Sequence, residues 1–97
     1  MNYNDFRLGG RYKHKYKVND NHLIILMESF ANKNNNKNEF IEIDIYDNDL
    51  ISLVEQLEDN ELIAIIGHIE SETCTINDNF NYMNKILVAD KLMRKGN

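Results

Sequence analysis

Two aromatic and two acidic side chains share one face of a short predicted strand. Segment 39–46 reads EFIEIDIY, and the side chains of a strand point to opposite faces with a period of two. Its isoleucines therefore face a core, whereas Phe40, Glu42, Asp44 and Tyr46 face outward. Outward rings on a curved sheet can stack unpaired nucleic-acid bases. The alternative is that these rings pack against a neighbouring subunit or a hairpin.

A row of basic residues could supply the contacts to phosphates that such stacking leaves out. Segment 11–18 alternates, which predicts that Arg11, Lys13, Lys15 and Lys17 lie on one face. Side chains on one strand face recur about every 6.6 Å, close to the phosphate spacing of an extended single strand. The row therefore predicts phosphate contacts. Lysines on an exposed edge strand can also serve only to prevent edge-to-edge pairing of sheets.

The remaining polar residues do not favour catalysis or a metal site. Glu42 and Asp44 could hold a metal or share a proton, but an acidic stripe that meets solvent or lysines fits the pattern better. The histidines lack the spacing of zinc ligands, and Cys74 is the only cysteine. The sequence has no phosphate-binding glycine loop and no nucleophile with a base at a recognisable spacing. We therefore expect a protein without enzymatic activity and without a cofactor.

Length and charge limit the possible functions. The 97 residues, 42% apolar and 28% charged, suit one globular domain over 1–97, with a flexible arm at 1–7 and a frayed tail at 94–97. Seven basic and three acidic residues precede position 39, and four basic and thirteen acidic residues follow. This asymmetry indicates a basic binding strip on an acidic body, or two halves that attract each other. The net charge of −5 argues against a protein that coats duplex DNA.

The chain also lacks the signals of membrane or export targeting. No run of 18 apolar residues occurs, and the N-terminal residues contain no apolar signal core. A single cysteine suits a reducing compartment. We therefore expect a cytoplasmic protein that does not contact membranes.

The pattern of apolar residues predicts five strands and one helix. The helix is expected over about 49–58, capped by Asn48 or Asp49, because its apolar residues recur at helical spacing. An asparagine-rich loop at 32–38 and a turn at 77–79 separate strands. The strands are expected at 11–18, 22–31, 39–46, 62–69 and 81–89. The order strand, strand, strand, helix, strand, strand is that of the five-stranded OB-fold barrel.

The residues between Glu39 and Ser71 resemble those of the bacterial single-stranded DNA-binding proteins and the related primosomal replication protein. The resemblance lies in an aromatic-led third strand, a helix with a leucine stripe and a buried strand that contains Gly67. It extends more loosely over residues 8–93. It implies an OB-fold in which Phe30, Phe40 and Tyr46 stack bases. The family's fourth stacking position falls on Cys74, which cannot stack.

The resemblance implies binding to single-stranded DNA, or to RNA, by a homodimer or homotetramer that acts in replication, repair or mobile-element transfer. Acids at Glu42, Glu70 and Glu72 replace basic residues of the family. The alternative is therefore an interaction module that docks onto a protein, or mimics nucleic acid, through its acidic aromatic face. The candidate nucleic-acid contacts are Arg11, Lys13, Lys15, Lys17, Phe30, Lys33, Lys37, Phe40 and Tyr46.

Overall fold

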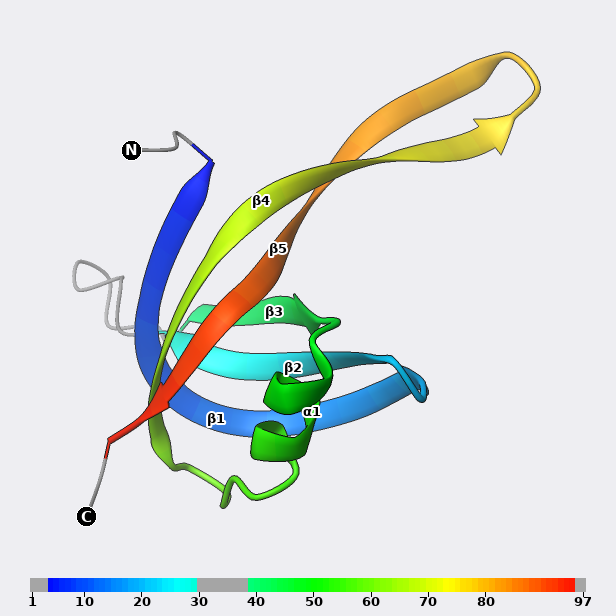
Figure 1. Ribbon diagram of the computed structural model, residues 1–97. Helices are drawn as coiled ribbons and strands as arrows, with labels where there is room; N and C mark the ends of the chain where they lie inside the picture. Colours follow the sequence, from blue (N-terminus) through cyan, green and yellow to red (C-terminus); the bar gives the residue numbers. More distant parts are fainter. Residues whose placement is uncertain (1–3, 30–38, 96–97) are drawn as a thin grey trace.

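The computed structural model describes residues 4–29 and 39–95 and contains one barrel with a projecting hairpin (Figure 1). Three of the candidate contacts, Phe30, Lys33 and Lys37, lie outside the described residues. The elements in chain order are β1 (Asp5–Asn19), β2 (His22–Ser29), β3 (Glu39–Ile45), α1 (Asn48–Val54), β4 (Leu62–Asn77) and β5 (Phe80–Arg94). No helix in the described ranges is long and apolar enough to cross a membrane.

The strands close into a barrel in the order β1-β2-β3-β5-β4. β1 is long enough to pair with both of its neighbours, with β4 through its first half and with β2 through its second. A parallel contact between Asp44 of β3 and Val88 of β5 completes the barrel. With α1 between the third and fourth strands, this topology confirms the predicted OB-fold.

Two glycines are required where the backbones approach most closely. Gly10 belongs to both pairings of β1, and a Cβ atom there would lie 2.0 Å from the carbonyl oxygen of Glu28. A Cβ atom at Gly67 would lie 2.0 Å from the Val88 carbonyl oxygen and 2.7 Å from the ring of Phe6. These two positions allow the strands to bend into a small barrel.

The barrel interior holds one apolar core. β2 alternates between buried and partly exposed residues, and each isoleucine of β3 is less exposed than its neighbours in the strand, as a half-buried strand requires. The side chains with the least exposure are Ile25, Met27, Ile43, Ile45, Ile65 and Val54. Helix α1 adds Ile51 and Val54 to this core.

Helix α1 begins and ends differently from the prediction. Asp47, not Asn48 or Asp49, is the cap, because its carboxylate accepts hydrogen bonds from the amides of Asp49 and Leu50 at 2.8 and 3.1 Å. The helix ends at Val54, not near 58, because the next amides bond three residues back: Leu57 N donates to the Val54 carbonyl oxygen at 3.1 Å.

The hairpin of β4 and β5 extends much further than the predicted strands 62–69 and 81–89. Beyond Ile69 of β4 and Val88 of β5, the two strands pair only with each other. We call residues 70–86 the arm; it projects away from the barrel in Figure 1. Its turn at 78–79 agrees with the predicted turn. The sequence suggested a flexible segment at 1–7 and a frayed tail at 94–97. In the structure, residues 5–7 belong to β1 and Arg94 belongs to β5.

Candidate nucleic-acid interface

The outer face of β2 and β3 carries the aromatic pair found in the sequence. Paired residues on neighbouring strands share a face, and Phe40 is paired with Glu28. The inward residues Ile43 and Ile45 are fully buried, whereas Phe40 is 56% exposed and Tyr46 45% exposed. The alternation predicted for segment 39–46 is therefore confirmed, and both rings are accessible from solvent.

A bulge in β1 separates the four basic residues that were expected to share a face. Arg11 pairs with Glu28 on the outer face, but the register shifts between Tyr12 and His14, and Lys15 pairs with the fully buried Ile25. An inserted residue reverses the alternation of every side chain after it. Arg11 therefore lies level with Phe40, whereas Lys15 belongs to the opposite face. The expected row on a single face is wrong.

Two of the other basic residues have acidic partners. Lys13 lies in the bulge, where its ammonium group is 3.4 Å from a carboxylate oxygen of Glu28 and also donates to the side chain of Asn60. Lys17 forms an ion pair with Asp20 at 3.1 Å. These contacts partly neutralise the basic residues, so their attraction for phosphates is weaker than the sequence suggested.

The acids of the outer face are also partnered. Glu42 accepts a hydrogen bond from the hydroxyl of Tyr16, and this bond, above all, raises the pKa of Tyr16. A carboxylate oxygen of Asp44 lies 2.7 Å from Nε2 of His22. The His22 ring in turn stacks on Tyr46, with 4.2 Å between ring centroids and 17° between planes. The acids between the aromatics are therefore held by neighbours, and His22 fixes the ring of Tyr46.

His68 joins two carboxylates where the arm leaves the barrel. Its Nδ1 is 2.7 Å from Asp90, which is the extra residue of a bulge in β5, and its Nε2 is 2.6 Å from Glu70. Only an imidazolium can donate from both nitrogens, because the neutral ring carries one N–H. The hydrogen bonds to Asp90 and Glu70 accordingly raise the pKa of His68. When it is protonated, this ring offsets part of the negative charge where the arm leaves the barrel.

The arm presents two further aromatic rings. Tyr82 pairs directly with Cys74, and Phe80 lies two residues away on the same face of β5. Their ring centroids are 6.2 Å apart, and the side chains are 51% exposed for Phe80 and 44% exposed for Tyr82. The facing strand thus places the Tyr82 ring beside Cys74. The predicted turn at 77–79 could have revealed this pairing, because it sets residue 82 opposite residue 74.

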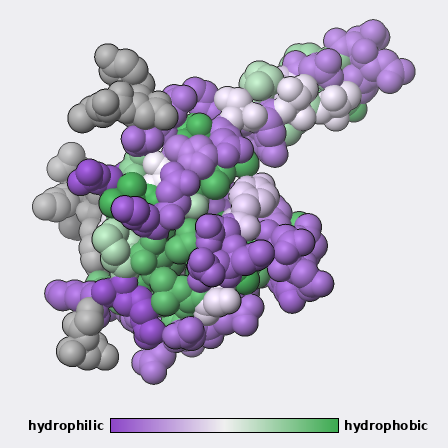
Figure 2. Space-filling view, viewed as in Figure 1, coloured by the Kyte–Doolittle hydropathy of each residue, from purple (hydrophilic) through white to green (hydrophobic). Residues whose placement is uncertain are grey.

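The acids at the base of the arm lie near Tyr46. Burial first, and then the charges of Asp44, Glu70 and Glu72, raise the pKa of Tyr46, which places the arm acids close to that ring. Along β4 the residues at 70, 72 and 74 share a face with Tyr82. In Figure 2 most of the arm is hydrophilic with separate apolar side chains, whereas larger hydrophobic areas lie on the barrel. We call Phe40, Tyr46, Tyr82 and Phe80 the aromatic track.

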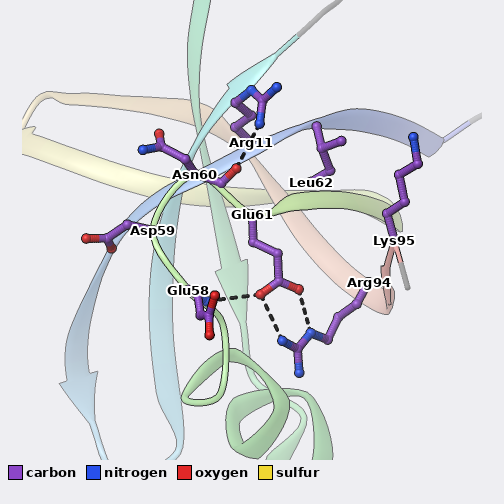
Figure 3. A pocket seen from close by; sticks show the side chains of 8 residues that line it. All are labelled: Arg11, Glu58, Asp59, Asn60, Glu61, Leu62, Arg94 and Lys95. Atoms are coloured by element: carbon purple, nitrogen blue, oxygen red, sulfur yellow. Dashed lines mark hydrogen bonds and ion pairs between the residues drawn. The ribbon is translucent and has the colours of Figure 1, made fainter. Parts of the chain in front are cut away.

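A polar pocket of about 400 Å³ is lined by residues 58–62, which follow α1 in the chain, and by Arg11, Arg94 and Lys95 (Figure 3). Arg94 forms two hydrogen bonds with Glu61, at 2.5 and 2.9 Å, and Arg11 donates to the carbonyl oxygen of Asn60 at 3.0 Å. Arg94 is therefore held by Glu61, whereas this contact engages only one of the N–H groups of Arg11. Among the described residues, no group of three or more His, Cys, Asp or Glu side chains could hold a metal ion.

Comparison with known proteins identifies the fold and not a family. No family model matches the sequence, and no curated protein matches it. Solved structures do match: the mitochondrial single-stranded DNA-binding protein Rim1 of S. cerevisiae has 13% identity and a TM-score of 0.70, covering 100% of this chain and 99% of that one. A selenomethionine-labelled structure of Rim1 has 14% identity and a TM-score of 0.73, covering 100% and 99% of the two chains.

A third match is a complex. The single-stranded DNA-binding protein of Plasmodium falciparum, solved with single-stranded DNA, has 14% identity and a TM-score of 0.68, covering 99% of this chain and 97% of that one. At such identities the likeness shows a shared OB-fold barrel of similar size. The expected bacterial or primosomal type is not distinguished by these neighbours.

Proposed function

We propose that this protein binds single-stranded DNA without catalysing a reaction, and that bases stack along the aromatic track. The observation that carries the proposal is the exposure of four rings, two on the outer face of β3 and its end and two on one face of the arm. The structural neighbours include single-stranded DNA-binding proteins over nearly the whole chain. RNA could stack on the same rings, since every base has a π face.

Stacking can supply the affinity without strong electrostatic attraction. Each stacked base contributes about 1–3 kcal/mol, and a micromolar complex needs about 8 kcal/mol. Four rings supply about 4–12 kcal/mol in total, so an average of about 2 kcal/mol per ring places binding near the micromolar range. The partnering of Glu42 by Tyr16 and of Asp44 by His22 supports this proposal, because it lessens the repulsion that phosphates meet on the outer face.

The phosphate contacts form a smaller part of the proposal. Arg11 lies level with Phe40 on the outer face, and Lys13 follows in the bulge, so these two are the best placed of the basic residues. Lys15 and Lys17 come after the bulge and therefore belong to the opposite face of β1, so they are the weaker candidates. Phe30, Lys33 and Lys37 complete the proposed contacts on the basis of the sequence.

The test is a fluorescence titration of a labelled, unstructured oligonucleotide of about 15 nucleotides, a length within the site sizes of single OB-folds. Binding near the micromolar range, with tighter binding of the single strand than of the matched duplex, is the expected result. Absence of binding at low salt would refute the proposal.

The negative charge at the base of the arm favours a second candidate function. The protein would then dock onto another protein that carries a basic segment. Glu70 and Glu72 are exposed beside Tyr46, and the chain carries a net charge of −5. An acidic face with aromatic side chains suits the lysine and arginine side chains of a partner. Tight binding of an arginine-rich peptide together with no binding of oligonucleotides would favour this alternative.

Assembly and biological role belong to the same proposal. Residues 5–9 of β1 pair with β4, and the described residues supply no strand on their other edge. Such an edge can pair with a second copy, so we propose a homodimer or homotetramer, which light scattering would measure. The proposed role is to hold strands open in the cytoplasm during replication, repair or mobile-element transfer.

A further inference from the structure

Glu72 lies on β4 two residues from Cys74, the residue that pairs with Tyr82, and so on the arm face that carries this ring. Its charge contributes to the raised pKa of Tyr46, after burial, Asp44 and Glu70, and to the raised pKa of Tyr82, after Cys74 and burial. Both hydroxyls therefore lie within electrostatic range of one side chain. Glu72 is exposed and shares the arm face with Tyr82. A base that stacks on either ring would have this carboxylate near its edge.

Glu72 is also less engaged than the other acids on this side. Glu42 accepts from Tyr16, Asp44 from His22, and Glu70 from His68.

For Glu72, in contrast, the contacts are long. Asn84 Nδ2 lies at 3.5 Å and the Cys74 sulfur at 4.0 Å, and no Lys, Arg or His of the described residues comes within 4.0 Å to form an ion pair. Its oxygens remain able to accept hydrogen bonds from a ligand.

An ionised carboxylate accepts hydrogen bonds and donates none, so it distinguishes bases by the donors on their edges. Guanine presents an N1–H and an exocyclic amino group side by side, which match the two carboxylate oxygens. Cytosine and adenine each present one amino group. Thymine presents one N–H between two carbonyl oxygens, which a carboxylate repels.

We propose that Glu72 makes this protein selective for single strands whose stacked bases carry amino donors, guanine above all, over strands of thymine. This inference rests on the proposed binding of single strands. It gives a role to an acid that would only weaken a binder of phosphates. The selectivity is local, because it depends on one side chain beside two of the four rings.

The experiment compares three labelled oligonucleotides of about 15 nucleotides at one salt concentration. One is all thymine, one repeats thymine-thymine-guanine, and one repeats thymine-thymine-inosine, whose base keeps N1–H but lacks the amino group. Isolated guanines avoid the four-stranded structures that guanine runs form. We expect the guanine strand to bind about five- to twentyfold more tightly than the thymine strand, with the inosine strand between them.

Two variants assign the effect. Glu72→Gln keeps the size of the side chain but can both donate and accept, so the ratio between the guanine and thymine strands should fall to about twofold or less. Asp78→Asn is the matched control, because it removes the same charge at the turn of the same arm. It should raise binding of all three strands slightly and leave their ratio unchanged.

The outcomes separate this inference from the function on which it rests. If the protein binds all three strands with equal affinity, or if Glu72→Gln leaves the ratio unchanged, the inference is wrong and single-strand binding stands. If Asp78→Asn lowers the ratio as much as Glu72→Gln, the effect is general electrostatics and the inference also fails. If no strand binds, the proposed function fails and the inference with it.

Discussion

Replacing Tyr82 by alanine tests whether the arm takes part in binding. Tyr82 is 44% exposed and lies beyond the barrel, so its removal should change the free energy of unfolding little. Loss of one stacking ring should cost about 1–3 kcal/mol of binding free energy. Because about 1.4 kcal/mol corresponds to a factor of ten, the dissociation constant should rise about five- to 150-fold.

The adjacent residue provides a matched control. Met83 is 60% exposed and follows Tyr82 in β5, but it points to the other face of the arm, where it pairs with Thr73. Met83→Ala should therefore leave binding within about twofold of the original protein, since it removes an exposed side chain that no base would contact.

The assay is fluorescence anisotropy of a labelled, unstructured oligonucleotide of mixed sequence, with thermal unfolding measured for each variant. Equal effects of Tyr82→Ala and Met83→Ala would show that the arm matters only as a whole. No effect of Tyr82→Ala on an oligonucleotide of about 15 nucleotides would show that binding does not reach the arm.

Three other perturbations test the electrostatics and the fold. Arg11→Ala should make the fall of log affinity with log salt less steep by about 0.7, as measured by titration between about 50 and 200 mM salt. An unchanged slope would mean that Arg11 contacts no phosphate. Because the pKa of His68 is raised above its ordinary value of 6.5, its contribution to stability should be complete below pH 6.5 and be lost as pH rises through the raised pKa. In His68→Gln, urea unfolding at several pH values should lack that loss; the same loss in the variant would contradict the argument. Gly67→Ala should destabilise the barrel by about 1–3 kcal/mol in the same unfolding assay, because the added Cβ would collide with the Val88 backbone. Gly9→Ala, where nothing lies within 4 Å of such an atom, is its control and should show no comparable loss.

The fold followed from the sequence where apolar periodicity was strong. Segment 39–46 could be oriented because a half-buried strand alternates strictly, and the order of elements then indicated the OB-fold. The helix limits were less certain, since the cap Asp47 is one residue before the expected candidates and propensity does not fix helix ends closely.

The site was harder to derive because it depends on register and on polar segments. A bulge near Lys13 leaves no mark in the alternation of charged residues, yet it moves Lys15 to the other face. The arm carries few buried side chains, so no core pattern revealed that β4 and β5 continue past the barrel. The rings of Phe80 and Tyr82 were missed for the same reason.

Single-stranded DNA is proposed to bind along the aromatic track. The most direct measurement is an NMR titration of isotope-labelled protein with an unstructured oligonucleotide. Amide resonances of Phe40, Tyr46 and Tyr82 and their neighbours should shift, whereas those around Ala64 and Met93, on the outer face of β4 and β5, should stay in place. Shifts centred on Ala64 and Met93, or no shifts at saturating oligonucleotide, would contradict the account.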